Sequence, residues 1–307
     1  MNTETAAETG TATVTDTSTE PGRPRIVVGV TGPGHERAAL RYAAECARRD
    51  GAEVVLVHAV HPPYPAPPPS VLLTLDAAAD VGPWVAQEVG REFKELTDGA
   101  VAFRSVWREG PPARVLAELS HDARLVVVQH RHPHGLGRLL TWSTANGLAA
   151  HAHCPVVSVP PSWEPGAAPN EVVVGVHEEG GPREVLEAAF AWADATGASL
   201  RVVHAWRLDA VYDDIITRRV TAQWREEEKT LLDEAVAGLR ERHPEVHIVL
   251  EVRHQWPSDV LVDDSQAAAL VVVGRHGPRP WEPHHLGSIA RTVLREARSP
   301  VMVVPLG

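Results

Sequence analysis

Cysteine is scarce in this sequence, with only Cys46 and Cys154 among 307 residues. Two cysteines are too few for a disulfide framework or for a metal cluster built on cysteine ligands. Their scarcity indicates a reducing compartment, and we expect a cytoplasmic protein.

Long apolar runs and an excess of positive charge are missing as well. No run approaches the ~18 apolar residues that cross a bilayer. Residues 1–24 have neither the basic nor the apolar region of a secretory signal, and their Thr-, Ala- and Glu-rich composition predicts a disordered tail. With 29 Lys and Arg against 40 Asp and Glu, the formal net charge is −11, the wrong sign for holding a polyanion. We therefore expect neither a membrane nor a nucleic-acid partner.

Common enzyme signatures are also lacking. The chain has no G-x4-G-K-[ST] loop, no HExxH helix and no G-x-S-x-G elbow. The HRHPH cluster that begins at His130 is interrupted by a proline and has no cysteine or carboxylate beside it, so we expect no metal site there. The sequence therefore offers no catalytic residues.

An internal repeat organises the chain. IVVGV at Ile26–Val30 returns as VVVGV at Val172–Val176, a shift of 146 residues (172 minus 26), and PVVSVP at Pro155–Pro160 returns as PVMVVP at Pro300–Pro305, a shift of 145 (300 minus 155). The same domain therefore occurs twice. The predicted organisation is a tail over 1–24, a first domain over 25–160, a linker over 161–170 and a second domain over 171–307.

Each copy alternates short apolar runs with longer helical patterns. Runs such as IVVGV lack polar alternation, which is typical of strands buried on both faces of a parallel sheet. Helical patterns over Glu36–Arg49 and Arg183–Thr196 end before Gly51 and Gly197, where a helix C-cap glycine belongs. We predict an α/β fold with two tandem open parallel five-stranded sheets flanked by helices. Further helices are predicted over Val81–Leu96, Pro112–Ser120, Ala222–Arg240 and Pro257–Ser265.

The stretch VVVGRHGPRPWEPHHLGS, residues 271–288, places three glycines after the fourth strand of the second copy. Gly274, Gly277 and Gly287-Ser288 have the spacing G-x2-G-x9-G-S. Glycines leave backbone amides open to a phosphate, and a helix N-terminus follows the last one. The loop therefore predicts a phosphate site.

This glycine spacing after a VVV strand, with PVxVVP closing the sheet, resembles the universal stress protein family, and it does so in a tandem arrangement. The resemblance implies Rossmann-like domains of the adenine nucleotide alpha hydrolase type, arranged as an intrachain pseudo-dimer. The last strands, Val156–Val159 and Val301–Val304, would pair edge to edge. It also implies ATP as the ligand, alone or as its Mg²⁺ complex.

The resemblance assigns site residues only in the second copy. Those around the triphosphate and ribose are Gly274, Gly277, Gly287, Ser288 and Ile289; those near the adenine are Gly175, Val176, Ala205 and Val273. The family's ATP binders usually have an aspartate directly after the first strand, whereas this chain has His177. His177 can still hydrogen-bond an adenine or ribose edge.

The first copy departs further from that pattern. Its three glycine places hold Gln129, His132 and Trp142, and only Ser143 matches. Since bulky side chains fill the volume that a phosphate needs, we expect no ATP binding in the first domain.

These observations predict a regulatory stress-response protein that binds ATP or another adenine nucleotide in its second domain only. A nucleotide-independent scaffold that binds an unknown protein partner is an alternative, and a slow ATPase is a weaker one. Two chains can pair further as a homodimer. Two assignments stay open: Arg275 meets phosphates or is a surface charge, and Trp206 and Trp256, near strand ends, either cover a cleft or pack the domains together.

Overall fold

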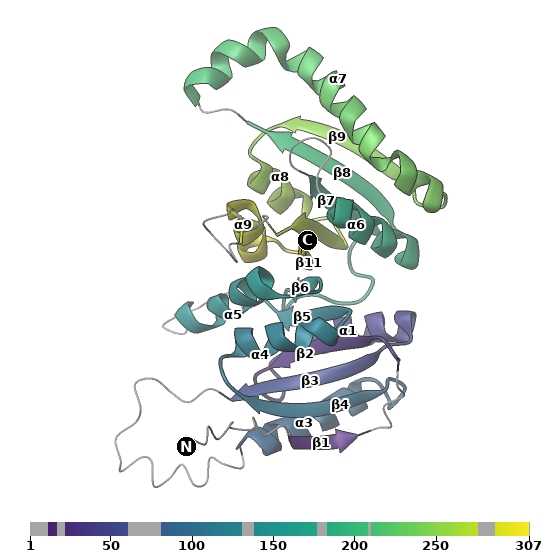
Figure 1. Cartoon of the computed structure of the whole chain (residues 1–307), viewed down its shortest axis with the longest axis vertical. Helices are drawn as coiled ribbons and strands as arrows, with labels where there is room; N and C mark the ends of the chain where they lie inside the picture. Colours follow the sequence, from purple (N-terminus) through teal and green to yellow (C-terminus); the bar gives the residue numbers. More distant parts are fainter. Residues whose placement is uncertain are drawn as a thin grey trace, which may run out of the picture. The chain divides into compact units, whose positions relative to one another are not determined.

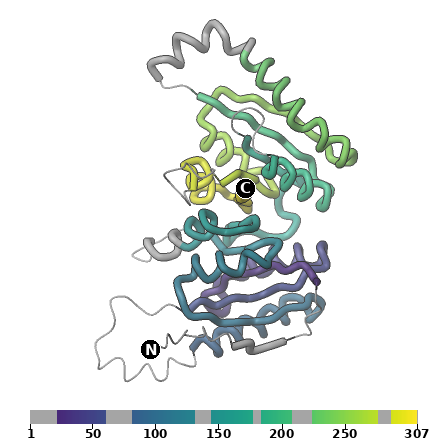
Figure 2. The backbone as a smooth tube through the Cα atoms, in the orientation of Figure 1, coloured from purple at the N-terminus to yellow at the C-terminus, as the bar shows by residue number. Residues whose placement is uncertain are grey.

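A computed structural model describes residues 12–16, 22–60, 81–130, 138–176, 183–207, 210–275 and 286–306 (Figures 1 and 2). The chain divides into two compact units, Met1–Gln129 and His130–Gly307. Both follow the predicted alternation of strands and helices around an open, mostly parallel sheet.

The first unit holds a five-stranded sheet in the order β1-β4-β3-β2-β5. All of its strands except β1 are parallel to their neighbours. Its elements are β1 (Ala12–Asp16), β2 (Arg25–Val30), α1 (Arg37–Asp50), β3 (Glu53–Val60), α3 (Val81–Leu96), β4 (Phe103–Glu109), α4 (Pro112–Leu119), a 3-10 turn (Ser120–Asp122) and β5 (Leu125–Gln129).

Strand β1 lies within residues 1–24, for which the sequence predicted a disordered tail, and differs from that prediction at Ala12–Asp16. It runs antiparallel to β4, with Ala12 opposite Trp107 and Asp16 opposite Arg104. The edge of a sheet presents unpaired backbone groups, and the Thr-Val-Thr run at Thr13–Thr15 has high β propensity. The tail therefore supplies a strand that covers this edge.

The helix ends follow the predicted glycine and proline signals. Gly51 ends α1 in the left-handed conformation at φ 62°, and Gly197 has the same φ of 62° after the corresponding helix of the second repeat. Only glycine adopts this backbone conformation without strain. Pro112 lies in the first turn of α4, where its missing N–H removes no helical hydrogen bond.

The second unit holds a six-stranded sheet in the order β6-β11-β10-β7-β8-β9. Strands β7 to β11 are parallel, as predicted. Its elements are α5 (Arg138–His151), β6 (Val156–Val159), β7 (Glu171–Val176), α6 (Arg183–Thr196), β8 (Ser199–Trp206), α7 (Ala210–Arg242), β9 (Ile248–His254), α8 (Pro257–Asp264), β10 (Leu270–Gly274), α9 (Ser288–Glu296) and β11 (Val301–Val304). Helix α7 begins earlier than predicted, because the β-branched residues near Ile215 weaken its sequence pattern without ending the helix.

The last strands of the two sequence repeats pair with each other, as predicted. Strand β6 runs antiparallel to β11, with Val157 opposite Met302, and both strands are fully buried. The last helix and strand of the first repeat therefore belong to the second compact unit, where α5 packs beside α9 (Figure 2).

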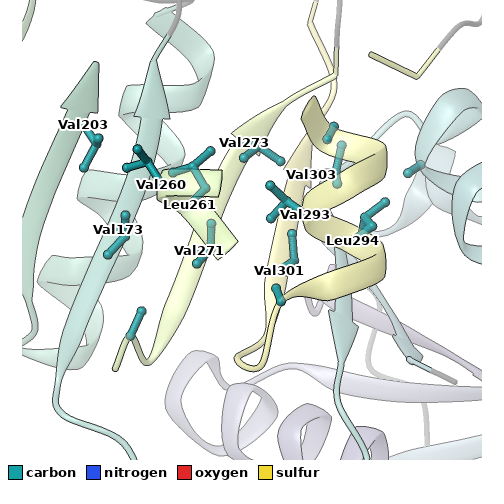
Figure 3. Close-up of a cluster of buried hydrophobic side chains, with 14 of the residues drawn as sticks. Val173, Val203, Val260, Leu261, Val271, Val273, Val293, Leu294, Val301 and Val303 are labelled. Carbon is teal, nitrogen blue, oxygen red and sulfur yellow. The ribbon is translucent and has the colours of Figure 1, made fainter. Parts of the chain in front are cut away.

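A valine-rich core fixes α8 and α9 on one face of this sheet (Figure 3). Alternate strand residues such as Val203, Val271 and Val303 point toward Leu261 of α8 and Val293 of α9. Since each helix follows a parallel strand, its N-terminus lies at the carboxyl edge of the sheet, where ligands bind in open α/β folds.

Candidate functional site

A cavity of about 720 Å³ opens at this carboxyl edge. Among the described residues, it is lined by the end of β8, by Glu228 of α7, and by the first turns of α8 and α9. Its described lining consists of His204, Ala205, Trp206, Arg207, Glu228, Trp256, Pro257, Ser258, Ser288, Ile289 and Thr292. Its volume lies within the range of small-molecule sites, roughly 300–1,000 Å³.

Two helix N-termini meet at the cavity, and neither has an N-cap residue whose side chain caps it. Helix α8 begins after Trp256 and α9 after Gly287, and in both the N-cap residue makes no side-chain hydrogen bond to the first turn. The first amides of a helix carry partial positive charge and have no acceptor within the helix. Ser288 adds a hydroxyl group at the start of α9, whereas the Ser258 hydroxyl donates to the carboxylate of Asp259 in the first turn of α8, at 3.3 Å. The start of α9 is therefore the part of the cavity suited to an anion.

The cavity also has an aromatic wall, formed by Trp206 and Trp256. The ring of Trp206 lies 5.4 Å from that of Trp224 in an edge-to-face arrangement and 4.4 Å from that of His254. The guanidinium carbon of Arg207 lies 5.5 Å from the centre of the Trp256 ring. Trp256 is 45% exposed, which is unusual for so large an apolar side chain.

A histidine and a glutamate add polar groups to the lining. Nδ1 of His204 lies 3.3 Å from the carbonyl oxygen of Val176, and Nε2 lies 3.6 Å from Oε2 of Glu228. The first repeat has the same histidine contact, since Nδ1 of His58 lies 3.2 Å from the oxygen of Val30. Because a carbonyl only accepts, Nδ1 donates in both repeats, and Nε2 of His204 is left facing Glu228.

The structure brings together part of the site that the resemblance assigns. Ala205, Ser288 and Ile289 line the cavity, and Gly287 is the N-cap of α9. The other assigned residues in the described ranges end β7 and β10 without lining the cavity: Gly175, Val176, Val273 and Gly274. His177 and Gly277 lie outside the described residues.

Close packing between strand and helix accounts for two of the glycines. A Cβ on Gly175 would lie 2.6 Å from Cδ1 of Leu261, and one on Gly274 would lie 2.9 Å from Cγ2 of Val185. The first repeat has the matching contact, because a Cβ on Gly29 would lie 2.8 Å from Cδ1 of Leu116. A side chain at Gly29 or Gly175 would therefore have to displace a leucine of the helix that packs on the strand.

Arg275, for which the sequence left two roles open, contacts the end of α5 in the structure. Its Nη1 donates to the carbonyl oxygens of Ala150, at 3.0 Å, and of Ala152, at 2.9 Å, at the end of α5. Burial lowers the pKa of its guanidinium. A cation at the negative end of a helix is stabilising, so Arg275 holds the last helix of the first repeat.

In the first repeat, the residues at the corresponding positions make hydrogen bonds within the protein. Oε1 of Gln129, the residue equivalent to Gly274, accepts from the amides of Ala38, at 3.1 Å, and Ala39, at 3.3 Å, in the first turn of α1. The hydroxyl of Thr31 donates to Oε1 of Glu36 at 2.6 Å. The side chains of Trp142 and Ser143, and all of His132, lie outside what the structure describes.

Sequence reasoning did not assign the other described lining residues to the site, namely His204, Trp206, Arg207, Glu228, Trp256, Pro257, Ser258 and Thr292. Most of them lie at or just after the ends of β8 and β9, so large or polar residues at the ends of parallel strands were the available signal. Glu228 lies in the middle of α7 and has no such signal.

The described ranges hold no group of three or more His, Cys, Asp or Glu side chains placed to bind a metal ion. None of their helices is long and apolar enough to cross a membrane.

The strand order and the position of the cavity define a doubly wound, Rossmann-like α/β protein. The sequence model of the Universal stress protein family matches residues 22–160 and 170–305. The chain therefore belongs to the universal stress protein family, and it contains two tandem copies of the domain.

Relatives and solved structures agree with this assignment. A universal stress protein of Mycolicibacterium smegmatis is 32% identical over 289 residues, which cover 91% of this chain and 96% of the relative. One from Mycobacterium tuberculosis is 33% identical over 298 residues, covering 91% of this chain and 95% of the relative. The crystal structure of a universal stress protein from Archaeoglobus fulgidus shares the fold, with a TM-score of 0.65 at 16% identity, covering 92% of this chain and 96% of that one.

Proposed function

We propose that this universal stress protein binds an adenine nucleotide, ATP alone or as its Mg²⁺ complex, in the cavity of its second repeat. The cavity combines the N-terminus of α9, which begins after Gly287 and has no acidic residue in its first turn, with an aromatic wall, and this single observation carries the proposal. The start of the helix favours phosphate oxygens, and the tryptophans favour a planar base.

Binding is proposed for the second repeat only. In the first repeat, Gln129 already satisfies amides at the start of α1, and Glu36 bonds to Thr31. Nucleotide occupancy in the second repeat would then regulate the protein by favouring one arrangement of the site and the partner surface around it.

Gly287→Asp tests the proposal directly. Gly287 has φ −57° and ψ 153°, a conformation open to any residue, and aspartate is a favoured N-cap. The variant should keep its thermal stability, while its carboxylate repels phosphate from the start of α9. Gly287→Asn is the matched neutral control.

Calorimetric titration with ATP should give binding by the wild type and by Gly287→Asn, and at least about tenfold weaker binding by Gly287→Asp, which corresponds to about 1.4 kcal/mol. Mass spectrometry of small molecules released from the purified protein would identify a bound nucleotide independently. No binding by the wild type at millimolar ATP would instead favour a nucleotide-independent scaffold for a protein partner. Phosphate release above a protein-free blank would favour a slow ATPase.

A further inference from the structure

The domain fold does not need the two tryptophans that line the cavity, Trp206 and Trp256. The repeat shift of 146 residues (206 minus 60) puts Val60 at the position of Trp206, and the shift of 145 (256 minus 111) puts Pro111 at that of Trp256. The first repeat forms the same strands and helices with these smaller residues. The tryptophans therefore have a role that is local to the second cavity.

The rings of Trp206 and Trp256 differ in how closely other side chains pack against them. Trp206 is fixed between Trp224 of α7 and His254 of β9, so its orientation is set before any ligand binds. Trp256 is the N-cap of α8 and is 45% exposed beside the cavity, with Arg207 over its ring. Leaving so much apolar surface in water has a free-energy cost, which a ligand that covers the ring would remove.

Resting on the proposed function, we propose that Trp256, with Arg207 and Trp206, stacks against the base of the nucleotide, while the phosphates lie at the N-terminus of α9. A tryptophan face and a guanidinium plane both bind flat heteroaromatic rings. This places the base beside the ends of β8 and β9. It differs from the sequence-based assignment, which put the adenine near Gly175, Val176 and Val273 as well as Ala205.

The test compares a ligand that has both a base and phosphates with a ligand that has phosphates alone. Binding of ATP and of inorganic tripolyphosphate is measured by calorimetry for the wild type, Trp256→Ala and Trp256→Phe. Base stacking on an aromatic side chain contributes about 1–3 kcal/mol. Trp256→Ala should therefore weaken ATP binding roughly tenfold while leaving tripolyphosphate binding unchanged, and Trp256→Phe should restore most of the ATP affinity.

Trp84→Ala is the matched control, because Trp84 on α3 is 54% exposed and lies in the other unit. It should leave both affinities unchanged, and thermal melts should show that every variant is folded. Wild-type ATP affinity in Trp256→Ala would overturn the stacking inference and leave the proposed function standing. Equal weakening of ATP and tripolyphosphate would also overturn it. A wild type that binds neither compound would overturn the proposed function as well.

Discussion

Val157 on β6 and Met302 on β11 are equivalent residues of the two sequence repeats, and they lie opposite each other where the strands pair antiparallel. The neighbouring pairs, Val156 with Val303 and Ser158 with Val301, are related by the same exchange. The two strands therefore form a local two-fold junction that covers the exposed edges of both.

The junction predicts a strong effect of charge at its centre. Met302 is 3% exposed, so Met302→Lys would bury an ammonium group without a partner. We expect a loss of about 3 kcal/mol or more in the free energy of unfolding, measured in urea. Met302→Leu conserves volume and should cost less than about 1.5 kcal/mol. Equal stabilities of the two variants would show that the junction is not buried.

We expect Arg275 to stabilise the last turn of α5. Arg275→Met removes two charged hydrogen bonds to Ala150 and Ala152, and should cost about 2 kcal/mol. The last turn of α5 should then fray, so hydrogen exchange of the Ala152 amide, which donates to Leu148, should become faster. Arg295→Ala is the control, because the ion pair of Arg295 with Glu296 is exposed, and it should change stability by less than about 0.5 kcal/mol. Unchanged exchange at Ala152 would contradict the proposed role.

The packing of Gly175 predicts opposite effects of one substitution at two glycines. Gly175→Ala would place its Cβ 2.6 Å from Cδ1 of Leu261, so it should destabilise the protein by about 1–3 kcal/mol. Gly238→Ala, on α7 with no atom within 4 Å of the added Cβ, should stabilise it by up to about 1 kcal/mol. Thermal melts of both variants provide the measurement. A neutral Gly175→Ala would mean that Leu261 moves aside easily.

We expect the side chain of Gln129 to stabilise the start of α1, although Gln129 lies outside that helix. Gln129→Ala would leave the amides of Ala38 and Ala39 without their acceptor, at a cost of about 1 kcal/mol by analogy with helix N-caps. Gln266→Ala, at an exposed position, is the matched control and should be neutral within about 0.5 kcal/mol. Equal stabilities of the two variants in urea would show that Gln129 does not stabilise the start of α1.

Local patterns predicted most of the fold. The helix over Arg183–Thr196 has the predicted bounds, and the pairing of β6 with β11 agrees with the resemblance. Strand β1 was missed because its partner, β4, lies about ninety residues away in the chain, and a short Thr-rich run alone does not reveal a free sheet edge.

The candidate site was less predictable than the fold. Motif spacing led to Ser288 and Ile289, but Trp256 and Glu228 reach the cavity through the placement of α8 and α7, which depends on packing across the whole sheet. Arg275 illustrates the same limit, since its acceptors belong to the other sequence repeat and no local pattern connects them.

The buried thiol of Cys46 predicts how stability changes at alkaline pH. Burial in α1, opposed by the nearby Arg49, raises the pKa of Cys46 from about 9 to about 12. Below pH 9 the thiol is neutral in the folded and the unfolded chain, so the stability does not change with its ionisation. Above pH 9 the unfolded thiol ionises while the folded one does not, so stability falls as the pH rises toward 12. Between pH 8 and pH 10 this should amount to about 1.4 kcal/mol. Urea unfolding at both values should therefore show a larger loss for the wild type than for Cys46→Ala, and parallel losses would contradict the raised pKa.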